Sequence, residues 1–220
     1  MKAPLFFAAT LSWVGLVHGQ SFQWTLEAGG NGHFYQPVAS PGGIGWTDAR
    51  NAATAMGGYL VTLTSSAENQ FVFSLIDSQT YWYSGTTGHN YGPWIGASQD
   101  GTAVEPVGSW TWLHGDGAMA DTFSSWWPGE PNDAHYVTAP DGEDYAHFGR
   151  PGSPTLRAAT WNDLPDVPTF NPGDGVLVRS FVVEYDVSPV PEPETVGVLA
   201  GCALLGFALW RRYPSLLKPA

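Results

Sequence analysis

The sequence predicts an α+β domain in which two helices pack beside small antiparallel sheets and a long loop region follows. Two helical segments, separated by a strand-like run, occupy the first third of the chain. Short runs rich in Trp, Val and Ile then alternate with spacers rich in Gly and Pro, which is typical of strands joined by extended loops. Helices grouped before most of the strands favour α+β over an alternating α/β fold.

The first helix is predicted over residues 48–56. Thr47 is a good N-cap for it, and the two glycines at 57–58 are typical of its C-terminal end. Its apolar side chains recur at helical spacing and should form the buried face: Ala49, Ala52, Ala53 and Met56.

The second helix should begin after Ser65 or Ser66. Glu68 stands three residues after Ser65, so the two side chains are expected to form a capping box. The buried stripe of this helix is expected to comprise Phe71, Val72, Leu75 and Ile76.

Short strands are predicted in the remaining segments because these are rich in β-branched and aromatic residues. The expected strands cover residues 22–24, 33–38, 59–63, 94–97, 110–112, 161–163 and 181–184. Most of the tryptophans are expected in the core, and Trp126 or Trp127 should support the loop that follows them. The histidines show no metal-ligand spacing, so we expect polar surface roles for them.

Oxygen-bearing side chains gather in three short clusters between positions 130 and 163. Glu130, Asn132, Glu143, Asn162 and Asp163 offer five side-chain oxygens, and the carbonyl of Asp163 offers a sixth. Ca²⁺ takes about 6 to 8 oxygens and tolerates irregular geometry. Each acidic residue alone is typical of a solvated loop, but the three clusters together favour a calcium site.

These clusters resemble the C-type lectin domain, and the resemblance extends over residues 23–186. In that family a Glu-Pro-Asn loop, a Glu-Asp pair and a Trp-Asn-Asp strand bind one Ca²⁺, whose open positions take two sugar hydroxyls. The resemblance implies a C-type lectin-like fold. It also implies that five residues hold the metal and bind the sugar: Glu130, Asn132, Glu143, Asn162 and Asp163.

The order of acid and amide in Glu130-Pro131-Asn132 resembles family members that bind mannose-type sugars. We therefore expect mannose, fucose or N-acetylglucosamine as the carbohydrate partner. The resemblance also implies a cis peptide bond before Pro131, which is plausible only before proline. Long insertions before Glu143 and Asn162 depart from the animal pattern, and Tyr145 stands where the animal domains carry a cysteine.

Two other functions remain open from the sequence. A structural or protein-binding C-type lectin-like module would keep the fold without sugar recognition. A glycosidase would use two carboxylates such as Glu130 and Asp163, one with a raised pKa, but a bound Ca²⁺ would lower both pKa values. The sequence contains no Gly-x-Ser-x-Gly nucleophile motif. We therefore expect a protein that is not an enzyme.

The two ends of the chain resemble export signals. Residues 1–19 are typical of a secretory signal peptide, although a first transmembrane helix is an alternative. The domain is expected over residues 20–188. Residues 189–220 contain Pro-Glu-Pro, an apolar segment and two arginines, which resembles the bacterial PEP-CTERM sorting signal read by an exosortase. This implies a transient inner-membrane anchor, then location at the cell surface or in the extracellular matrix of a Gram-negative bacterium; a plain membrane anchor is the alternative.

The charge of the exported part excludes one class of partner. It carries four arginines, no lysine and 18 acidic residues, a formal charge of −14. Binding to nucleic acid rests on neutralising phosphates with Lys and Arg, so no nucleic acid partner is expected. The sole cysteine, Cys202, lies in the tail, so the domain must fold without a disulfide.

Overall fold

The computed structural model describes residues 20–85, 88–100, 104, 106–115, 117–119, 122–135, 142–153, 155–166 and 178–189. The expected signal peptide, and the sorting tail apart from Pro189, lie outside these residues. Within the part that is described, no helix combines the length and apolar character needed to cross a membrane.

The described strands join into one mixed sheet in the order β1-β2-β9-β5-β7-β8, with β3 pairing on β9, and β4 and β6 on β5. All pairs are antiparallel except β5 and β9, which run parallel and connect the two halves of the sheet. The strands are β1 (Phe22–Gln23), β2 (Phe34–Ala39), β3 (Tyr59–Leu60), β4 (Tyr83–Ser84), β5 (Asn90–Ser98), β6 (Thr111–Trp112), β7 (Tyr145–Arg150), β8 (Trp161–Leu164) and β9 (Ser180–Tyr185).

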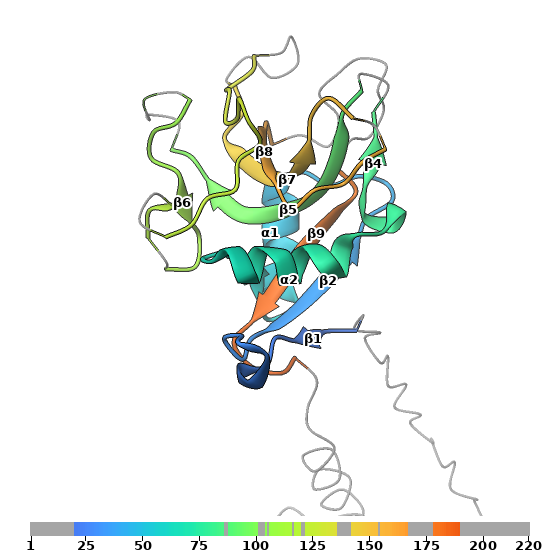
Figure 1. Ribbon diagram of the computed structural model, residues 1–220, viewed down its shortest axis with the longest axis vertical. Coiled ribbons are helices and arrows are strands. Elements are labelled where there is room, and N and C mark those ends of the chain that lie inside the picture. Colours follow the sequence, from blue (N-terminus) through green and yellow to red (C-terminus); the bar gives the residue numbers. More distant parts are fainter. Residues whose placement is uncertain are drawn as a thin grey trace, which may run out of the picture.

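Two α-helices flank this sheet, α1 (Trp46–Ala55) and α2 (Ser66–Ile76), with short 3-10 helices η1 (Leu26–Ala28) and η2 (Gln79–Tyr81). In Figure 1, α2 crosses the front of the domain and α1 lies behind it; β1, β2 and the end of β9 occupy the lower end, and β7 and β8 the upper end. The predicted α+β class is confirmed, and the elements follow the order that the C-type lectin resemblance implied.

The core has two parts because alternate residues of each central strand point to opposite faces of the sheet. Val182 of β9 packs in the part that contains Val72 and Ile76 of α2. Its neighbours Phe181 and Val183 pack in the part that contains Ala49 and Ala53 of α1. A strand covered on both faces must be apolar throughout, which accounts for the Phe-Val-Val run in β9.

The prediction of Thr47 as the N-cap of the first helix was wrong. The helix begins two residues earlier, with Gly45 as N-cap, and glycine offers no side-chain cap. The backbone N–H of Thr47 instead donates to Oδ1 of Asp166, at 2.9 Å. The carboxylate of Asp166, which follows β8 in the sequence, therefore caps α1. Gly57, with φ of 86°, follows the C-terminal end of α1 as expected.

The start of α2 was predicted correctly in part. The Ser65 hydroxyl accepts the N–H of Glu68 at 3.1 Å, which confirms Ser65 as the N-cap. The Glu68 carboxylate accepts instead from the backbone N–H of Thr64 at 2.8 Å and from the Tyr35 hydroxyl at 2.6 Å. Glu68 thus joins the helix start to β2 rather than closing a capping box.

The strand predictions were right in position and wrong in length. The expected strand over 59–63 is only Tyr59–Leu60, whereas the expected strand over 94–97 extends over Asn90–Ser98. The strand Tyr145–Arg150 was not predicted, because its sequence YAHFGR lacks an apolar alternation. The expected core role of the tryptophans is confirmed for those that are almost fully buried: Trp46, Trp82, Trp94, Trp110, Trp112 and Trp161.

Candidate functional site

The loop that carries Glu130 and Asn132 is fastened to β8 before it reaches them. The backbone N–H of Trp127 donates to the carbonyl of Trp161 at 2.8 Å, and the N–H of Glu130 turns back to the carbonyl of Trp127 at 2.8 Å. The Trp126 ring meets the Trp161 ring nearly at right angles, with centroids 5.9 Å apart. The expected supporting role of these tryptophans is confirmed, and the Glu130–Pro131 peptide bond is cis, as expected.

The Asp163 side chain forms hydrogen bonds to the tip of this loop. Its side chain is fully buried on β8. Its carboxylate accepts the backbone N–H groups of Asn132 at 3.0 Å and Asp133 at 2.9 Å. Burial nevertheless raises the pKa of Asp163 to about 6, against the lowering effect of these hydrogen bonds. The buried charge is therefore only partly compensated.

Glu130 lies beside Asp163, and its carboxylate charge is compensated by fewer hydrogen bonds. Its Oε2 atom is buried and has no hydrogen-bond partner. The pKa of Glu130 is raised to about 7, first by burial, then by repulsion from Asp163 and by a hydrogen bond with that carboxyl. The Asn132 side chain hydrogen-bonds to Glu130 and opposes this shift. The structure thus brings together Glu130, Asn132 and Asp163.

Glu143 is fastened to the same loop at the start of β7. Its side chain is buried, and its Oε2 atom accepts the backbone N–H of Ala134 at 3.0 Å. Its own N–H donates to Oδ1 of Asp133 at 3.0 Å. Gly142 has φ of 94°, and a side chain there would clash with the Asp133 carboxylate, so the close approach requires glycine.

Asn162 precedes Asp163 on β8 and is also buried. Its Nδ2 donates to the Asp163 carbonyl at 2.5 Å. The carbonyl that was expected as a sixth ligand is therefore already hydrogen-bonded to an expected ligand. We call the five residues the loop site: Glu130, Asn132, Glu143, Asn162 and Asp163.

Two features of the loop site favour a bound cation. An unpartnered buried carboxylate oxygen and two neighbouring carboxyls with raised pKa values are both relieved by a positive ion. Oxygen donors from carboxylates and carboxamides are the ligands that Ca²⁺ prefers. Among the described residues, no group of three or more His, Cys, Asp or Glu side chains is placed so that it could hold a metal ion by itself. The loop-site residues therefore fit Ca²⁺ as a mixed carboxylate and carboxamide set.

A cavity of about 320 Å³ opens beside the loop site. Glu130 and Pro131 form one side of it, and Trp110, Trp126 and Met119 form an apolar side. The Trp110 and Trp126 rings pack edge to face, with centroids 4.7 Å apart. From the sequence, Trp110 was expected in the core, which its burial confirms; only the folded chain shows that the segment after β5 lies against the loop that carries Glu130.

One curated relative is clearly similar in sequence. The chain is 34% identical to a perlucin-like protein from Mytilus galloprovincialis over 125 residues, which are 57% of this chain and 65% of that relative. The chain thus spans somewhat under two thirds of the length of this relative. No protein-family model matches the chain.

Among solved structures, the chain resembles the C-type carbohydrate-recognition domain of cow CD23, crystallised with an oligosaccharide, at 22% identity and a TM-score of 0.44, over 71% of this chain and 89% of that one. The C-type lectin domain of murine dendritic cell inhibitory receptor 2, in complex with an N-glycan, gives 20% identity and a TM-score of 0.46, over 70% and 90%. A calcium-independent type II antifreeze protein gives 19% identity and a TM-score of 0.42, over 70% and 85%.

Proposed function

We propose that residues 20–188 form a C-type lectin-like domain that binds carbohydrate through a Ca²⁺ ion at the loop site. The observation that supports this most directly is the buried Oε2 atom of Glu130, which lacks a partner beside the Asp163 carboxyl. Leaving such an oxygen unpaired is costly, and a cation there removes the cost. No catalytic role is proposed.

The residues of the loop site contribute two kinds of oxygen ligand. Glu130, Glu143 and Asp163 supply negative charge, while Asn132 and Asn162 supply neutral carbonyl oxygens. When bound, Ca²⁺ would supply open coordination positions for two neighbouring sugar hydroxyls. Glu130 can only accept from a hydroxyl, whereas the Asn132 amide can donate to one. Glu130 and Asn132 therefore select sugars by the orientation of the two neighbouring hydroxyls.

The sugar proposed is of the mannose class, which includes mannose, fucose and N-acetylglucosamine. The apolar cavity beside Glu130 and Pro131 supports this proposal, because the partly exposed Trp126 offers a sugar ring an aromatic surface.

A glycan array probed with and without EDTA tests the proposal, and soluble mannose and galactose serve as competitors. We expect binding in Ca²⁺, none in EDTA, and competition by mannose. Asn162→Ala should abolish binding, and Glu130→Gln combined with Asn132→Asp should shift the preference toward galactose. A matched control is Asn31→Ala, because Asn31 lies away from the loop site, beside Glu68.

One result would overturn the sugar proposal while keeping the calcium site. If Ca²⁺ stabilises the domain but no monosaccharide competes, the structural or protein-binding module becomes the better interpretation.

We also propose that the chain matures by two cuts, one before Gln20 and one near the Pro-Glu-Pro motif at 191–193, with the tail as a transient membrane anchor. The order of Pro-Glu-Pro, apolar segment and two arginines supports an exosortase substrate displayed at the bacterial surface or matrix. Intact-mass measurement on native material tests this. A mature protein that retains Arg211 and Arg212 would indicate a permanent anchor.

A further inference from the structure

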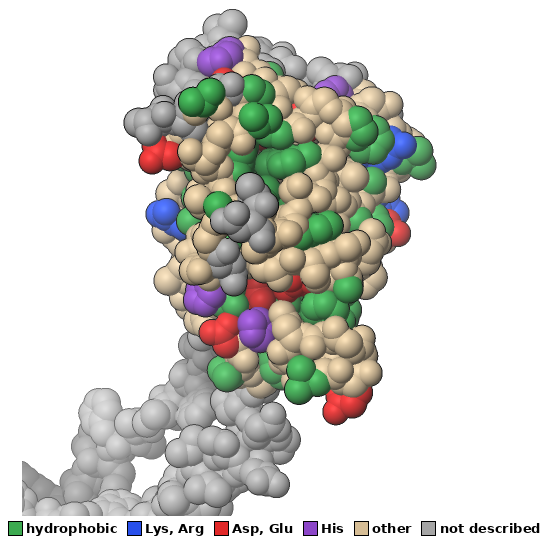
Figure 2. All heavy atoms as spheres, turned by 60° about the vertical axis from the view of Figure 1, so that its left-hand side comes forward, with side chains coloured by type: hydrophobic (Ala, Val, Ile, Leu, Met, Phe, Trp, Pro, Cys, Tyr) green, Lys and Arg blue, Asp and Glu red, His purple; other side chains and the backbone are tan. Residues whose placement is uncertain are grey.

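A second hollow, of about 190 Å³, lies at the end of the domain opposite β8. Figure 2 shows histidine side chains beside a recessed group of acidic side chains near the lower end of this face. We call the hollow the base pocket and define it by six of its residues, none of which belongs to the loop site: His33, Thr62, Glu68, His114, Glu184 and Asp186.

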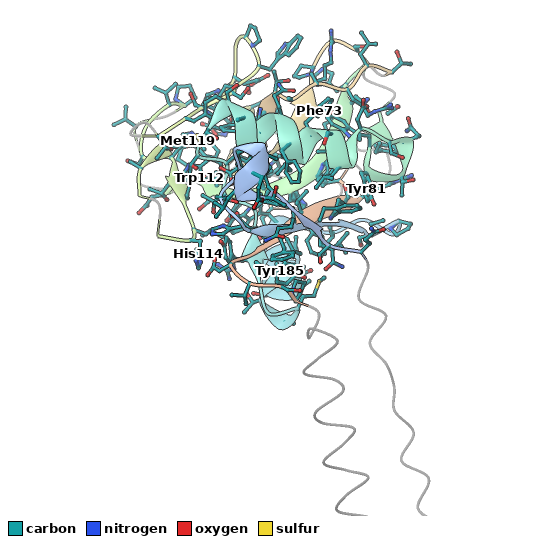
Figure 3. The ribbon with its side chains drawn as sticks, turned by 60° about the horizontal axis from the view of Figure 1, so that its bottom comes forward. Phe73, Tyr81, Trp112, His114, Met119 and Tyr185 are labelled. Carbon is teal, nitrogen blue, oxygen red and sulfur yellow. The ribbon has the colours of Figure 1, made fainter. Side chains whose placement is uncertain are left out.

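Distant segments of the chain meet at this pocket. His33 comes just before β2 and Asp186 just after β9; these strands are antiparallel neighbours, with Phe34 opposite Tyr185. His114 follows β6, and Figure 3 shows it at the edge of the domain, on the same lower side as Tyr185. The sheet pairing therefore gathers polar side chains that are far apart in the sequence.

The wall of the base pocket carries a buried hydroxyl that lacks a partner. Thr62 is 3% exposed and lines the pocket, and its Oγ1 atom has no hydrogen-bond partner among the described residues. Buried polar groups almost always have a partner in the protein or in a bound molecule. The place of this hydroxyl on the wall of a hollow therefore points to a ligand.

Three carboxylates make the pocket negative. Glu68 and Glu184 are almost fully buried, and Asp186 lies at the rim with 57% of its side chain exposed. Burial raises the pKa of Glu184 to about 7, because desolvation disfavours the charged form. The described residues that line the pocket include no lysine or arginine. A cation in the pocket would stabilise the charged form of these acids.

The domain has no spare side chain to supply that cation. Residues 20–188 contain no lysine. Arg157 donates to Asp77 at 2.6 Å. The other three guanidinium groups lie over aromatic rings: Arg50 over Trp46, Arg150 over Trp127 and Arg179 over Tyr83. The cation must therefore come from another molecule.

His33 offers a further acceptor to the pocket. Its Nδ1 atom lies 2.7 Å from Oε1 of Glu184, and the other oxygen of Glu184 accepts the backbone N–H of Thr62 at 2.9 Å. With Nδ1–H donating to Glu184, the lone pair is on Nε2. This nitrogen lies 4.0 Å from Oδ1 of Asp186.

The spacing of these acceptors suits an ammonium group better than a metal ion. Across the described part of the chain, no group of three or more His, Cys, Asp or Glu side chains is placed to hold a metal. At ordinary hydrogen-bond lengths, two acceptors of one ammonium nitrogen lie about 4 to 5 Å apart. The gap of 4.0 Å between His33 and Asp186 fits this range without movement.

We propose that the base pocket binds the ammonium group of a small primary amine. An ammonium group has three N–H donors and no acceptor. Three acceptors face it: Nε2 of His33, the carboxylate of Asp186 and the hydroxyl of Thr62. A free alkylamine and an amino sugar both carry this group.

A guanidinium group fits this pocket less well. It pairs best with both oxygens of one carboxylate at once. Both oxygens of Glu184 already have protein donors, and Oδ1 of Asp186 accepts the Tyr59 hydroxyl at 2.7 Å. No carboxylate at the centre or rim of the pocket thus presents two free oxygens in the same plane.

NMR titration of the full chain with ethylammonium chloride tests the proposal, at constant ionic strength and in EDTA. EDTA keeps Ca²⁺ from the loop site, so the result does not depend on the carbohydrate proposal. At about pH 8 an alkylamine is protonated, and the Glu184 carboxyl, with a pKa of about 7, is ionised. We expect saturable shifts of the His33 and His114 imidazole protons. Those of His89 should not move, because His89 stacks on Tyr91 instead.

Further probes define the group that is bound. Tetramethylammonium has the charge but no N–H donor, so it should bind at least about 10-fold more weakly than ethylammonium. Glucosamine should bind, whereas N-acetylglucosamine, whose nitrogen is uncharged, should not. Tighter binding of glucosamine than of ethylammonium would identify an amino sugar as the source, and equal binding a free amine.

Variants assign the acceptors. Thr62→Val removes the hydroxyl and keeps the shape, and Asp186→Asn removes the charge but keeps an oxygen for the Tyr59 hydroxyl. Each should weaken ethylammonium binding about 10-fold. Thr62→Ser keeps a hydroxyl and should bind as wild type. Glu27→Gln is the matched control for charge, because Glu27 is exposed on η1.

Three results would each overturn the proposal. They are the lack of saturable shifts, equal binding of tetramethylammonium and ethylammonium, and binding unchanged in both Thr62→Val and Asp186→Asn. Circular dichroism checks that the variants fold.

Discussion

Both ends of the domain bury a pair of carboxylates, but they compensate the charge differently. Where β2 pairs with the end of β9, Glu68 accepts the Tyr35 hydroxyl at 2.6 Å, and Glu184 accepts the Thr62 N–H at 2.9 Å beside His33. At the loop site, Asp163 receives two backbone N–H groups, and an oxygen of Glu130 has no partner.

Burial raises the pKa of Glu184 to about 7, as it raises that of Glu130, so the two ends differ in hydrogen-bond partners rather than in the cost of burial. A buried carboxylate whose oxygens meet protein donors stabilises the fold by joining the elements that supply them. A buried carboxylate that lacks donors costs free energy until an ion arrives. The acids alone therefore do not identify a binding site, but their unmet hydrogen bonds do.

The largest effect is expected from Glu68→Ala at the end of the domain away from the loop site. This change leaves the Thr64 N–H without its acceptor and leaves the Tyr35 hydroxyl only its longer bond, 3.3 Å, to Oε1 of Glu184, so it should lower the free energy of unfolding by about 3 kcal/mol. Urea denaturation measures it, with the exposed Glu27→Ala as control. A loss no greater than that of the control would contradict the structural role of Glu68.

A further prediction concerns His147, a titratable residue that lies between the two ends of the domain. His147 is fully buried against Tyr91 and Trp94, and burial lowers its pKa from 6.5 to about 3. The unfolded chain takes up a proton below pH 6.5 and the folded chain does not, so stability is present above pH 6.5 and falls as the pH drops toward 3.

Between pH 6.5 and 5 this loss should be on the order of 2 kcal/mol. Urea denaturation at a series of pH values, in wild type and His147→Gln, measures the difference. Parallel pH profiles for the two proteins would show that His147 titrates normally.

The helix caps should each contribute about 1 kcal/mol. Ser65→Ala removes a cap supplied within α2, and Asp166→Ala removes the cap that the loop region supplies to α1. Thermal melts should show similar losses for both variants. A neutral Asp166→Ala would mean that α1 does not depend on the loop region.

The smallest effect expected is calcium stabilisation at the loop site. For a dissociation constant near 1 mM, about 2 mM Ca²⁺ should stabilise the domain by roughly 0.6 kcal/mol. Thermal melts in Ca²⁺ and in EDTA measure the shift, which Glu130→Gln should reduce and Glu27→Gln should retain. Coincident melting curves for the wild type would remove the support for the loop site as a calcium site.

The sequence by itself determined the features whose cause lies within a few residues. The Ser65 cap, the glycine after α1, the helical faces and the aromatic core follow from local propensity and periodicity. The Glu-Pro-Asn and Trp-Asn-Asp motifs predicted the residues of the loop site from their order along the chain, and the structure brings Glu130, Asn132 and Asp163 of that set together.

Only the tertiary structure decided which distant groups meet. The Asp166 carboxylate caps α1 by accepting the N–H of Thr47, 119 residues earlier in the chain. The Glu68 carboxylate accepts from the Tyr35 hydroxyl of β2 rather than closing a capping box with Ser65. The scattered histidines gave no signal, yet His33 and His114 face one carboxylate, and His147 is buried rather than on the surface as expected. Pairing between strands fixes such neighbours, and no pattern within a short stretch of sequence encodes it.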